Sequence, residues 1–227
     1  MTKVLLYSGG LDSLCTRYVW KPDVLLYVDL GSAYSVAEIA RLDGDVQVVR
    51  LRDVGQWERE DRIIPLRNLF LVAVAAQYGD TIALGATAGD RVLDKSYEFA
   101  RMTTELFTYL WRPQHWTDGK AVQVVLPVKN LTKRALVRAA IDSGVSPLHL
   151  ETASFSCYEP QSGAPCGRCK PCWRRWVAFA GNGIWSKPNC RDYVREVVYP
   201  ALSSGTEDRG AELADVEHAL SLAGVWR

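Results

Sequence analysis

The sequence predicts an α/β fold, in which a Rossmann-like parallel sheet carries helices on both faces and a small helical subdomain follows at the C-terminal end. Short apolar runs alternate with helical patterns through the first 150 residues, which is typical of parallel strands connected by helices. A glycine-rich turn directly follows the first run, and four cysteines gather between residues 157 and 172. These three observations organise the chain into residues 1–150 and residues 151–227.

Five apolar runs are predicted to be strands. They are residues 4–7, 24–28, 46–51, 81–84 and 122–126. Their nearly continuous hydrophobicity is typical of strands that are covered on both faces. Ligands in such folds bind at the carboxyl ends of the strands. The residues that directly follow each run are therefore the first candidates for a site.

Helical patterns fill the gaps between the runs. They cover residues 12–20, 33–42, 66–78, 102–111 and 132–143. The pattern at 66–78 is apolar almost all round, which predicts a buried helix. The pattern at 132–143 has Thr132 as its expected N-cap and stops before Gly144. Its apolar positions form one stripe, made of Leu136, Val137, Ala140 and Ile141.

The pattern changes after residue 150. A loop rich in cysteine, proline and glycine is expected at 154–172, because these residues interrupt regular elements. A helix is predicted at 173–179, a helix or short strand at 193–199, and an amphipathic helix at 211–222. The second part is therefore expected to be mostly helical.

Composition narrows the class of protein. The chain has 227 residues, of which 48% are hydrophobic and 23% charged, as in a soluble globular protein. The net charge of +1 gives no support for direct binding of nucleic acid. No apolar run reaches the ~20 residues that span a bilayer, and the N-terminus is too short for a secretory signal. We expect a cytoplasmic protein that does not enter a membrane.

The cysteine spacing predicts a metal site. The pattern is C-x8-C-x2-C-x2-C, formed by Cys157, Cys166, Cys169 and Cys172. Four thiolates suit tetrahedral Zn2+, and a closed four-cysteine site is structural rather than catalytic. An iron–sulfur cluster and free thiols are the alternatives. Gly167, Arg168 and Lys170 would place amides and positive charge around the dianionic site. Cys15 and Cys190 are interpreted as bystanders.

The turn after the first strand has the composition of an anion-binding loop. It consists of Ser8, Gly9, Gly10, Leu11, Asp12 and Ser13. Glycines let the backbone approach a ligand closely, and a helix N-terminus attracts an anion such as phosphate. An ordinary strand–helix turn is the alternative. The string matches neither the GxxxxGK[ST] loop nor GxGxxG. It resembles the PP-loop of the N-type ATP pyrophosphatases, which implies ATP, Mg2+ and adenylation of a carboxylate or carbonyl oxygen.

Further segments, taken together with this loop, resemble the QueC family of 7-cyano-7-deazaguanine synthases. The similarity covers about residues 3–180. Its elements are Asp29-Leu30-Gly31, Ile64-Pro65-Leu66-Arg67-Asn68, Gly85-Ala86 with Asp90, Pro127 with Leu131-Thr132-Lys133, Ser156-Cys157-Tyr158-Glu159-Pro160, and Cys166-Gly167-Arg168-Cys169 with Cys172.

The resemblance implies a PP-loop fold of the adenine nucleotide alpha-hydrolase-like type and an ATP-dependent ligase. The family adenylates 7-carboxy-7-deazaguanine, and ammonia then gives first the amide and afterwards the nitrile. Residues 8–13 would bind the ATP phosphates, and Asp29, Gly31 and Gly85 the nucleotide. Lys133, Arg67, Asp12 and Ser13 would serve catalysis. Substrate contacts would come from Asp90, Asp94, Arg67 and Asn68. The resemblance also implies a homodimer and one structural zinc ion.

One segment departs from the family pattern. The family reads approximately YPDCRPEF where this chain has Val92-Leu93-Asp94-Lys95-Ser96-Tyr97-Glu98-Phe99. The ATP half therefore matches better than the acceptor half. Asp94 is the candidate for the guanidine-like edge of a deazaguanine, with an ion pair to Lys95 or Arg91 as the alternative. Arg67 could instead cap a helix, and Lys133 could be a solvated first-turn residue.

Three other functions are open, and the departure favours the first of them. A diverged relative would adenylate another carboxylate, of a deazapurine or a protein terminus, or stop at the amide. It could serve nucleic-acid modification or a defence system. Insertion of sulfur into tRNA would need a catalytic cysteine. A zinc-stabilised binding module without activity would not require the SGGLDS string.

Overall fold

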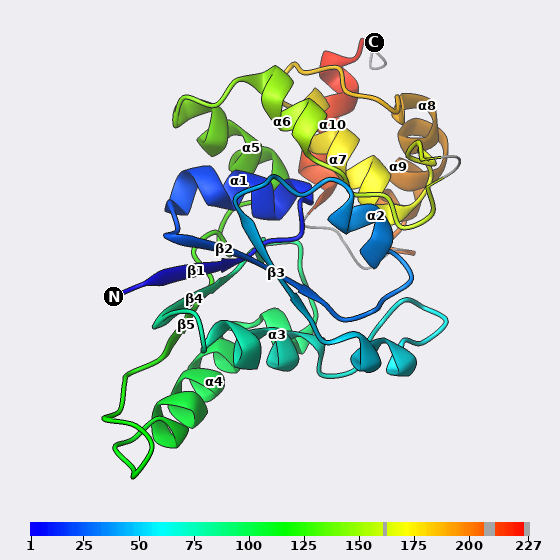
Figure 1. Ribbon diagram of the computed structural model, residues 1–227. Helices are drawn as coiled ribbons and strands as arrows, with labels where there is room; N and C mark the ends of the chain where they lie inside the picture. The colour runs from blue at the N-terminus through cyan, green and yellow to red at the C-terminus, as the bar shows by residue number, and fades with distance from the viewer. Residues whose placement is uncertain (161–162, 207–211, 225–227) are drawn as a thin grey trace. The chain divides into compact units, whose positions relative to one another are not determined.

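The computed structural model describes residues 1–160, 163–206 and 212–224, and it confirms the predicted α/β class (Figure 1). The chain forms two compact units. The first, here called the sheet unit, comprises residues 1–8, 20–86 and 90–129. The second, here called the cysteine unit, comprises residues 9–19, 87–89 and the chain from residue 130 onward. The domain boundary predicted at residue 150 falls inside the cysteine unit.

The sheet unit is built on five parallel strands. They are β1 (Lys3–Leu6), β2 (Val24–Asp29), β3 (Val46–Arg50), β4 (Thr81–Leu84) and β5 (Gln123–Val125). Their order in the sheet is β3-β2-β1-β4-β5, and each neighbouring pair is parallel. The register aligns Leu6 of β1 with Leu26 of β2 and with Leu84 of β4. All five predicted runs are therefore strands.

The strands differ in burial because they differ in position. In the central strand β1, Val4 and Leu5 are fully buried although they point to opposite faces. Strand β3 lies at one edge of the sheet formed by the described residues, and its Gln47 and Arg50 are exposed. The expectation that every run is covered on both faces is thus wrong for β3.

The helical segments of the sheet unit begin where local signals place them. They are α2 (Ser35–Ile39), η1 (Arg52–Trp57), α3 (Arg67–Ala75), η2 (Leu93–Lys95) and α4 (Tyr97–Leu110). Helix α4 starts five residues before the predicted bound, because Ser96 caps it. The Ser96 Oγ accepts a hydrogen bond of 3.0 Å from the Phe99 amide. Helix α2 is shorter than predicted, and η1 and η2 were not predicted at all.

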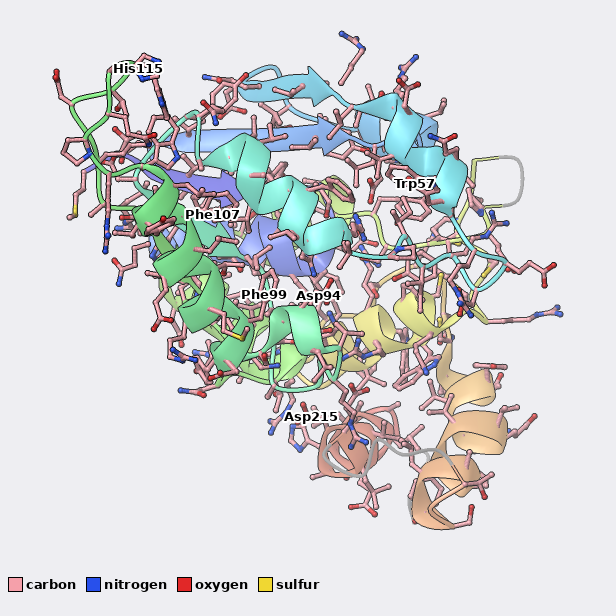
Figure 2. All side chains as sticks on the ribbon, turned by 90° about the horizontal axis from the view of Figure 1, so that it is seen from below. Trp57, Asp94, Phe99, Phe107, His115 and Asp215 are labelled. Carbon is pink, nitrogen blue, oxygen red and sulfur yellow. The ribbon has the colours of Figure 1, made fainter. Side chains whose placement is uncertain are left out.

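The sheet-unit core is apolar. Helices α3 and α4 pack against strands β1, β2, β4 and β5 through one contiguous cluster of buried side chains. Val72 of α3 and Phe107 of α4 belong to it, and Figure 2 shows Phe107 on the side of α4 that faces α3. Leu69 and Phe70 on α3 are only partly buried, so this helix is less enclosed than its all-round apolar pattern predicts.

The cysteine unit is helical within its described residues. It contains residues 11–19 of α1 (Leu11–Trp20), together with α5 (Lys133–Asp142), α6 (Pro147–Ala153), α7 (Lys170–Ala180), α8 (Arg191–Tyr193), η3 (Val194–Val198), α9 (Tyr199–Ser203) and α10 (Leu213–Leu222). The predicted N-cap of α5 is confirmed, because Thr132 Oγ1 accepts a hydrogen bond from the Ala135 amide at 3.2 Å. Residue 211 of the last predicted helix lies outside the described residues.

The cysteine-unit core mixes thiols with aromatic rings. Cys157, Cys172 and Cys190 are buried in one cluster with Trp173 and Trp176. By contrast, Trp185 is exposed. No helix in the described part of the chain is both long enough and apolar enough to cross a membrane.

Candidate functional site

The glycine loop joins β1 to α1. Gly9 has a φ of +69°, a conformation that favours glycine. The buried Ser13 closes the turn, because its Oγ donates to the Gly10 carbonyl at 3.0 Å. The Leu14 amide donates to the same carbonyl at 3.0 Å and begins the helix. Asp12 and Ser13 therefore lie in the first turn of a ten-residue helix, where the helix dipole favours an anion.

Lys133 and Asp12 form an ion pair. The Lys133 ammonium donates to both carboxylate oxygens of Asp12. The two side chains are only 16% and 21% exposed, so solvent screens the pair weakly. Lys133 is the first residue of α5, directly after its cap Thr132. The structure thus brings together two predicted residues that are 121 positions apart in the chain.

The other predicted nucleotide residues follow strands of the sheet unit. Ser8 comes two residues after β1, Asp29 ends β2, Gly31 follows it, and Gly85 follows β4. Because the strands are parallel, these residues lie at one edge of the sheet. The strand order reverses between β1 and β4, and ligands bind at such switch points in open α/β sheets.

Asp29 is buried and fixes the turn at this edge. Its Oδ2 accepts from Arg52 Nε at 2.6 Å, and its Oδ1 accepts from the Gly31 amide at 3.0 Å. Burial alone would raise the pKa of Asp29, but these hydrogen bonds outweigh burial and the pKa lies below its ordinary value. Gly31 has a φ of +76°, and a Cβ there would lie 2.4 Å from the Arg52 carbonyl oxygen. Asp29 therefore shapes the backbone of the predicted nucleotide edge.

Arg67 and Asn68 start α3. The Arg67 guanidinium lies 5.7 Å from the centre of the Tyr34 ring, within cation–π range. The Asn68 side-chain amide donates to the Asp94 carbonyl at 3.2 Å. Sequence reasoning missed Glu38. Burial raises the pKa of its carboxyl group, and the charge of Arg67 partly offsets this rise. The Tyr27 hydroxyl donates to Glu38 at 2.8 Å, and no motif marked this pair.

The segment that departs from the family pattern forms η2 and the start of α4. Lys95 pairs with Asp90, with 3.5 Å between Nζ and Oδ2, and Lys129 Nζ donates to the Asp90 carbonyl at 2.7 Å. The side chains of Lys95 and Asp90 are 29% and 13% exposed. The ion-pair partner of Lys95 is thus Asp90. Asp94 lies on η2, shortly before Phe99 on α4 (Figure 2).

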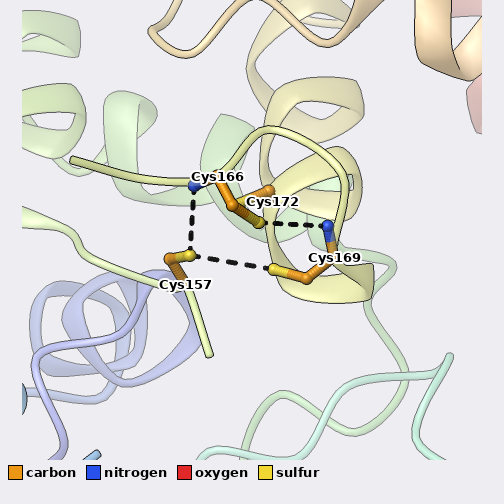
Figure 3. A group of neighbouring side chains, drawn as sticks. All are labelled: Cys157, Cys166, Cys169 and Cys172. Atoms are coloured by element: carbon orange, nitrogen blue, oxygen red, sulfur yellow. Dashed lines mark hydrogen bonds between the residues drawn. The ribbon is translucent and has the colours of Figure 1, made fainter. Parts of the chain in front are cut away.

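The four predicted metal ligands converge. Their Sγ atoms all lie within 4.8 Å of one another (Figure 3). A tetrahedral zinc site with Zn–S bonds of about 2.3 Å places sulfurs roughly 3.8 Å apart. The Sγ atoms of Cys157 and Cys169 are 3.9 Å apart. Backbone amides point at the cluster, because Cys166 N donates to Cys157 Sγ at 3.2 Å and Cys169 N to Cys166 Sγ at 3.4 Å. The cluster therefore fits a structural zinc ion.

The thiols differ in acidity. A hydrogen bond from Cys172 lowers the pKa of Cys169 to about 5, and the same bond raises the pKa of Cys172. Burial raises the pKa of Cys15 to about 12, and the Asp12 charge adds to this effect. Burial likewise raises the pKa of Cys190 to about 12. Because thiolates are the reactive form, the latter two cysteines are poor nucleophiles.

Two features define the class of this protein: a glycine loop between a central parallel strand and a helix, and a group of four cysteines whose geometry fits a metal ion. Among known families, the one described as "Queuosine biosynthesis protein QueC" matches residues 24–183, which is more than half of the chain. The chain belongs to the QueC family. The glycine loop precedes the matched region.

Curated relatives extend the match beyond that region. The 7-cyano-7-deazaguanine synthase 2 of Sulfurisphaera tokodaii is 32% identical over 175 residues, covering 74% of this chain and 36% of the relative. The synthase of Saccharolobus solfataricus is also 32% identical, with 35% of its length covered. The chain thus spans about a third of the length of these two relatives. That of Acaryochloris marina is 28% identical, with 81% of this chain and 96% of the relative covered.

Proposed function

We propose that the chain is an ATP-dependent carbon–nitrogen ligase that converts 7-carboxy-7-deazaguanine into 7-cyano-7-deazaguanine. The observation that supports this most is the SGGLDS loop at the N-terminus of α1, with Lys133 paired to Asp12, in a chain of the QueC family. The names of the curated relatives supply the product. Family membership alone does not require ATP, so the loop carries that part of the proposal.

The proposed reaction has three balanced stages. A carboxylate oxygen of the substrate attacks the α-phosphorus of ATP, and pyrophosphate leaves. Ammonia then attacks the acyl carbon, a proton is lost, and AMP leaves to give the amide. The amide oxygen then attacks the α-phosphorus of a second ATP and pyrophosphate leaves, and loss of AMP and two protons from the adenylated amide gives the nitrile. Each stage develops negative charge on phosphate, which cationic side chains and a helix N-terminus stabilise.

The residues of the cysteine unit are assigned to the phosphates. Backbone amides of the loop and the N-terminus of α1 bind the anion, and Ser13 maintains the turn. The Asp12 carboxylate would hold Mg2+, an ion that would gather phosphate oxygens and neutralise their charge. Lys133, now paired with Asp12, balances the charge that develops on phosphate.

The residues of the sheet unit are assigned to nucleoside and acceptor. Asp29, Gly31 and Gly85 shape the edge that receives the nucleoside, whereas Arg67 balances the charge of the acceptor carboxylate. Asp90, Asp94 and Asn68 face the deazapurine in this proposal. An acidic side chain can accept hydrogen bonds from the N–H groups of its guanidine-like edge.

A second candidate is a diverged relative that activates another carboxylate, in a deazapurine or a protein terminus, or that stops at the amide. The observation that favours it is Lys95, which takes the place of a cysteine in the family segment and pairs with Asp90. This ion pair reduces the capacity of Asp90 to accept hydrogen bonds from a substrate. A tRNA-sulfurating function is disfavoured, since burial keeps the Cys15 and Cys190 thiols protonated.

The test is a turnover assay. Purified protein is mixed with ATP, Mg2+, ammonium and 7-carboxy-7-deazaguanine, and the products are read by mass spectrometry. Formation of the nitrile together with AMP supports the first candidate, whereas formation of the amide alone supports an enzyme that stops midway. If the acid is not consumed, both of these functions are refuted, and other carboxylates must be tested as substrates. Asp12→Ala should abolish AMP formation, whereas the control Asp142→Ala, at an exposed carboxylate on α5, should retain it.

Three further expectations remain predictions. They are that the protein forms a homodimer, that it is cytoplasmic, and that it does not bind nucleic acid directly.

A further inference from the structure

We infer that four consecutive residues, 154–157, couple the metal site to the glycine loop, so that metal and nucleotide each strengthen the binding of the other. Residues 154–157 are called the coupling segment below. Ser156 is assigned as a positioning residue that acts through the backbone of the loop. The inference rests on the proposed binding of a nucleotide at that loop.

The middle of the coupling segment fixes the glycine loop at two points. The Phe155 amide donates to the Gly9 carbonyl at 3.1 Å. The Ser156 Oγ accepts from the Leu11 amide at 3.3 Å. These bonds lie on either side of Gly10, and they come from outside the helix that the loop begins. The direction in which the loop amides point therefore depends on where residues 155 and 156 lie.

The C-terminal end of the coupling segment is a metal ligand. Cys157 is buried, and its Sγ accepts from the Cys166 amide and lies 3.9 Å from Cys169 Sγ. Successive Cα atoms are about 3.8 Å apart, so a ligand fixed at residue 157 restricts Ser156 directly. Coordination at Cys157 therefore limits the positions that the Ser156 hydroxyl can take.

The N-terminal end of the coupling segment is attached to the metal-bearing helix. Ser154 is buried, and its Oγ accepts from Arg175 Nε at 3.1 Å. The buried Arg175 also donates to the carbonyls of Glu151 and Lys187. Arg175 lies one turn after Cys172 on α7. A metal that orders the start of α7 therefore also orders Ser154, so the segment is tied to the site at both ends.

A cavity leaves the segment room to shift. A space of about 250 Å³ is bordered by Ser154, Phe155, Ser156 and Cys157, with Arg175 and Cys172 also lining it. Densely packed segments have one arrangement, whereas a segment beside a cavity can reach others at low cost. If the arrangement that binds metal is also the one that aligns the loop, each ligand must favour the other by the same factor.

The experiment measures zinc release from the loaded protein to a coloured chelator, with and without Mg2+ and ATP and without acceptor. The variants are Ser156→Ala, Ser156→Thr and the control Thr152→Ala, whose hydroxyl donates within α6. ATP should slow release about fivefold in the wild type, a modest coupling for two linked sites. Ser156→Thr and Thr152→Ala should keep this ratio, and Ser156→Ala should bring it to about one with unchanged zinc content. Equilibrium dialysis measures ATP binding in parallel.

The outcomes distinguish a failure of the role assigned to Ser156, a failure of the coupling, and a failure of the proposed function. Equal slowing in Ser156→Ala overturns the role of Ser156, and ATP binding without slowing in the wild type overturns the coupling while sparing the proposed function. Absence of ATP binding overturns the proposed function and this inference with it. If Ser156→Ala fails to fold, the wild-type ratio and the zinc dependence of ATP affinity still decide whether the two sites are coupled.

Discussion

The two units of this chain are stabilised by different kinds of interaction. The core of the sheet unit is formed by aliphatic and aromatic side chains from four strands and two helices. The cysteine unit has an apolar cluster of its own, to which it adds four thiols that can bind metal, a buried arginine, and ion pairs that connect α10 and its N-cap to other helices. Burial of apolar area is non-directional, whereas thiolates and charges require specific partners.

Because of this difference, the two units are expected to lose stability under different perturbations. A sheet core loses stability in proportion to the volume removed from it. A unit organised by charged groups instead depends on metal and pH, because both change the charges themselves. The chemistry-bearing residues Asp12 and Lys133 belong to the second kind of unit, so their arrangement is expected to respond to metal.

The largest expected effect is that of Cys169→Ala. Structural zinc contributes of order 10 kcal/mol in small zinc domains, and loss of one ligand should lower the free energy of unfolding by at least about 5 kcal/mol. Zinc content measured by mass spectrometry should fall, and hydrogen exchange should rise in α7 before β1. The control is Cys190→Ala, which removes a buried thiol that is not one of the four predicted metal ligands. Normal stability and normal metal content in Cys169→Ala would contradict the structural role.

The matching perturbation of the sheet unit is Leu26→Ala. Leu26 is fully buried in β2, and truncation of a buried leucine costs about 2–5 kcal/mol. Urea unfolding should show this loss while zinc content stays unchanged. The control Leu93→Ala removes a side chain that is 87% exposed and should change stability by less than about 0.5 kcal/mol. Loss of zinc in Leu26→Ala would show that the metal site also depends on the core of the sheet unit, which would contradict this difference between the units.

A smaller effect is expected from Arg174→Met, which removes the partner of Glu212 near the start of α10. The Arg174 and Glu212 side chains are 11% and 15% exposed. Breaking a buried pair costs about 3–5 kcal/mol, and the residual exposure here should reduce this to about 2 kcal/mol. Thermal unfolding measures the loss. The double variant with Glu212→Gln should recover part of it, and additive losses would exclude coupling between the two residues.

The smallest effect is a pH dependence in the sheet unit. The folded pKa of Asp29 is lowered, so its contribution is present above the ordinary carboxyl pKa of about 4 and is lost as the pH falls through the folded value. Arg52→Ala should weaken the dependence of stability on pH in this range. The measurement is the urea midpoint between about pH 2.5 and 6. An identical profile in the variant would rule out Arg52 as the cause.

Local signals explain what could be predicted. Each apolar run became a strand, and Thr132 caps α5 as its position indicated. Helix α6 was missed, although Ser146 caps it and Pro147 begins it, because its seven residues are too few for a clear period. The cysteine spacing was sufficient to predict a cluster, since cysteines with two residues between them lie close together.

The sequence by itself determined the fold class, the glycine loop and the four-cysteine site, because each depends on residues that are near neighbours in the chain. The tertiary structure was needed to show that Lys133 pairs with Asp12 and that residues 154–157 contact both the glycine loop and the metal ligands. These contacts join distant segments. Their geometry follows from how whole elements pack, which no local pattern encodes.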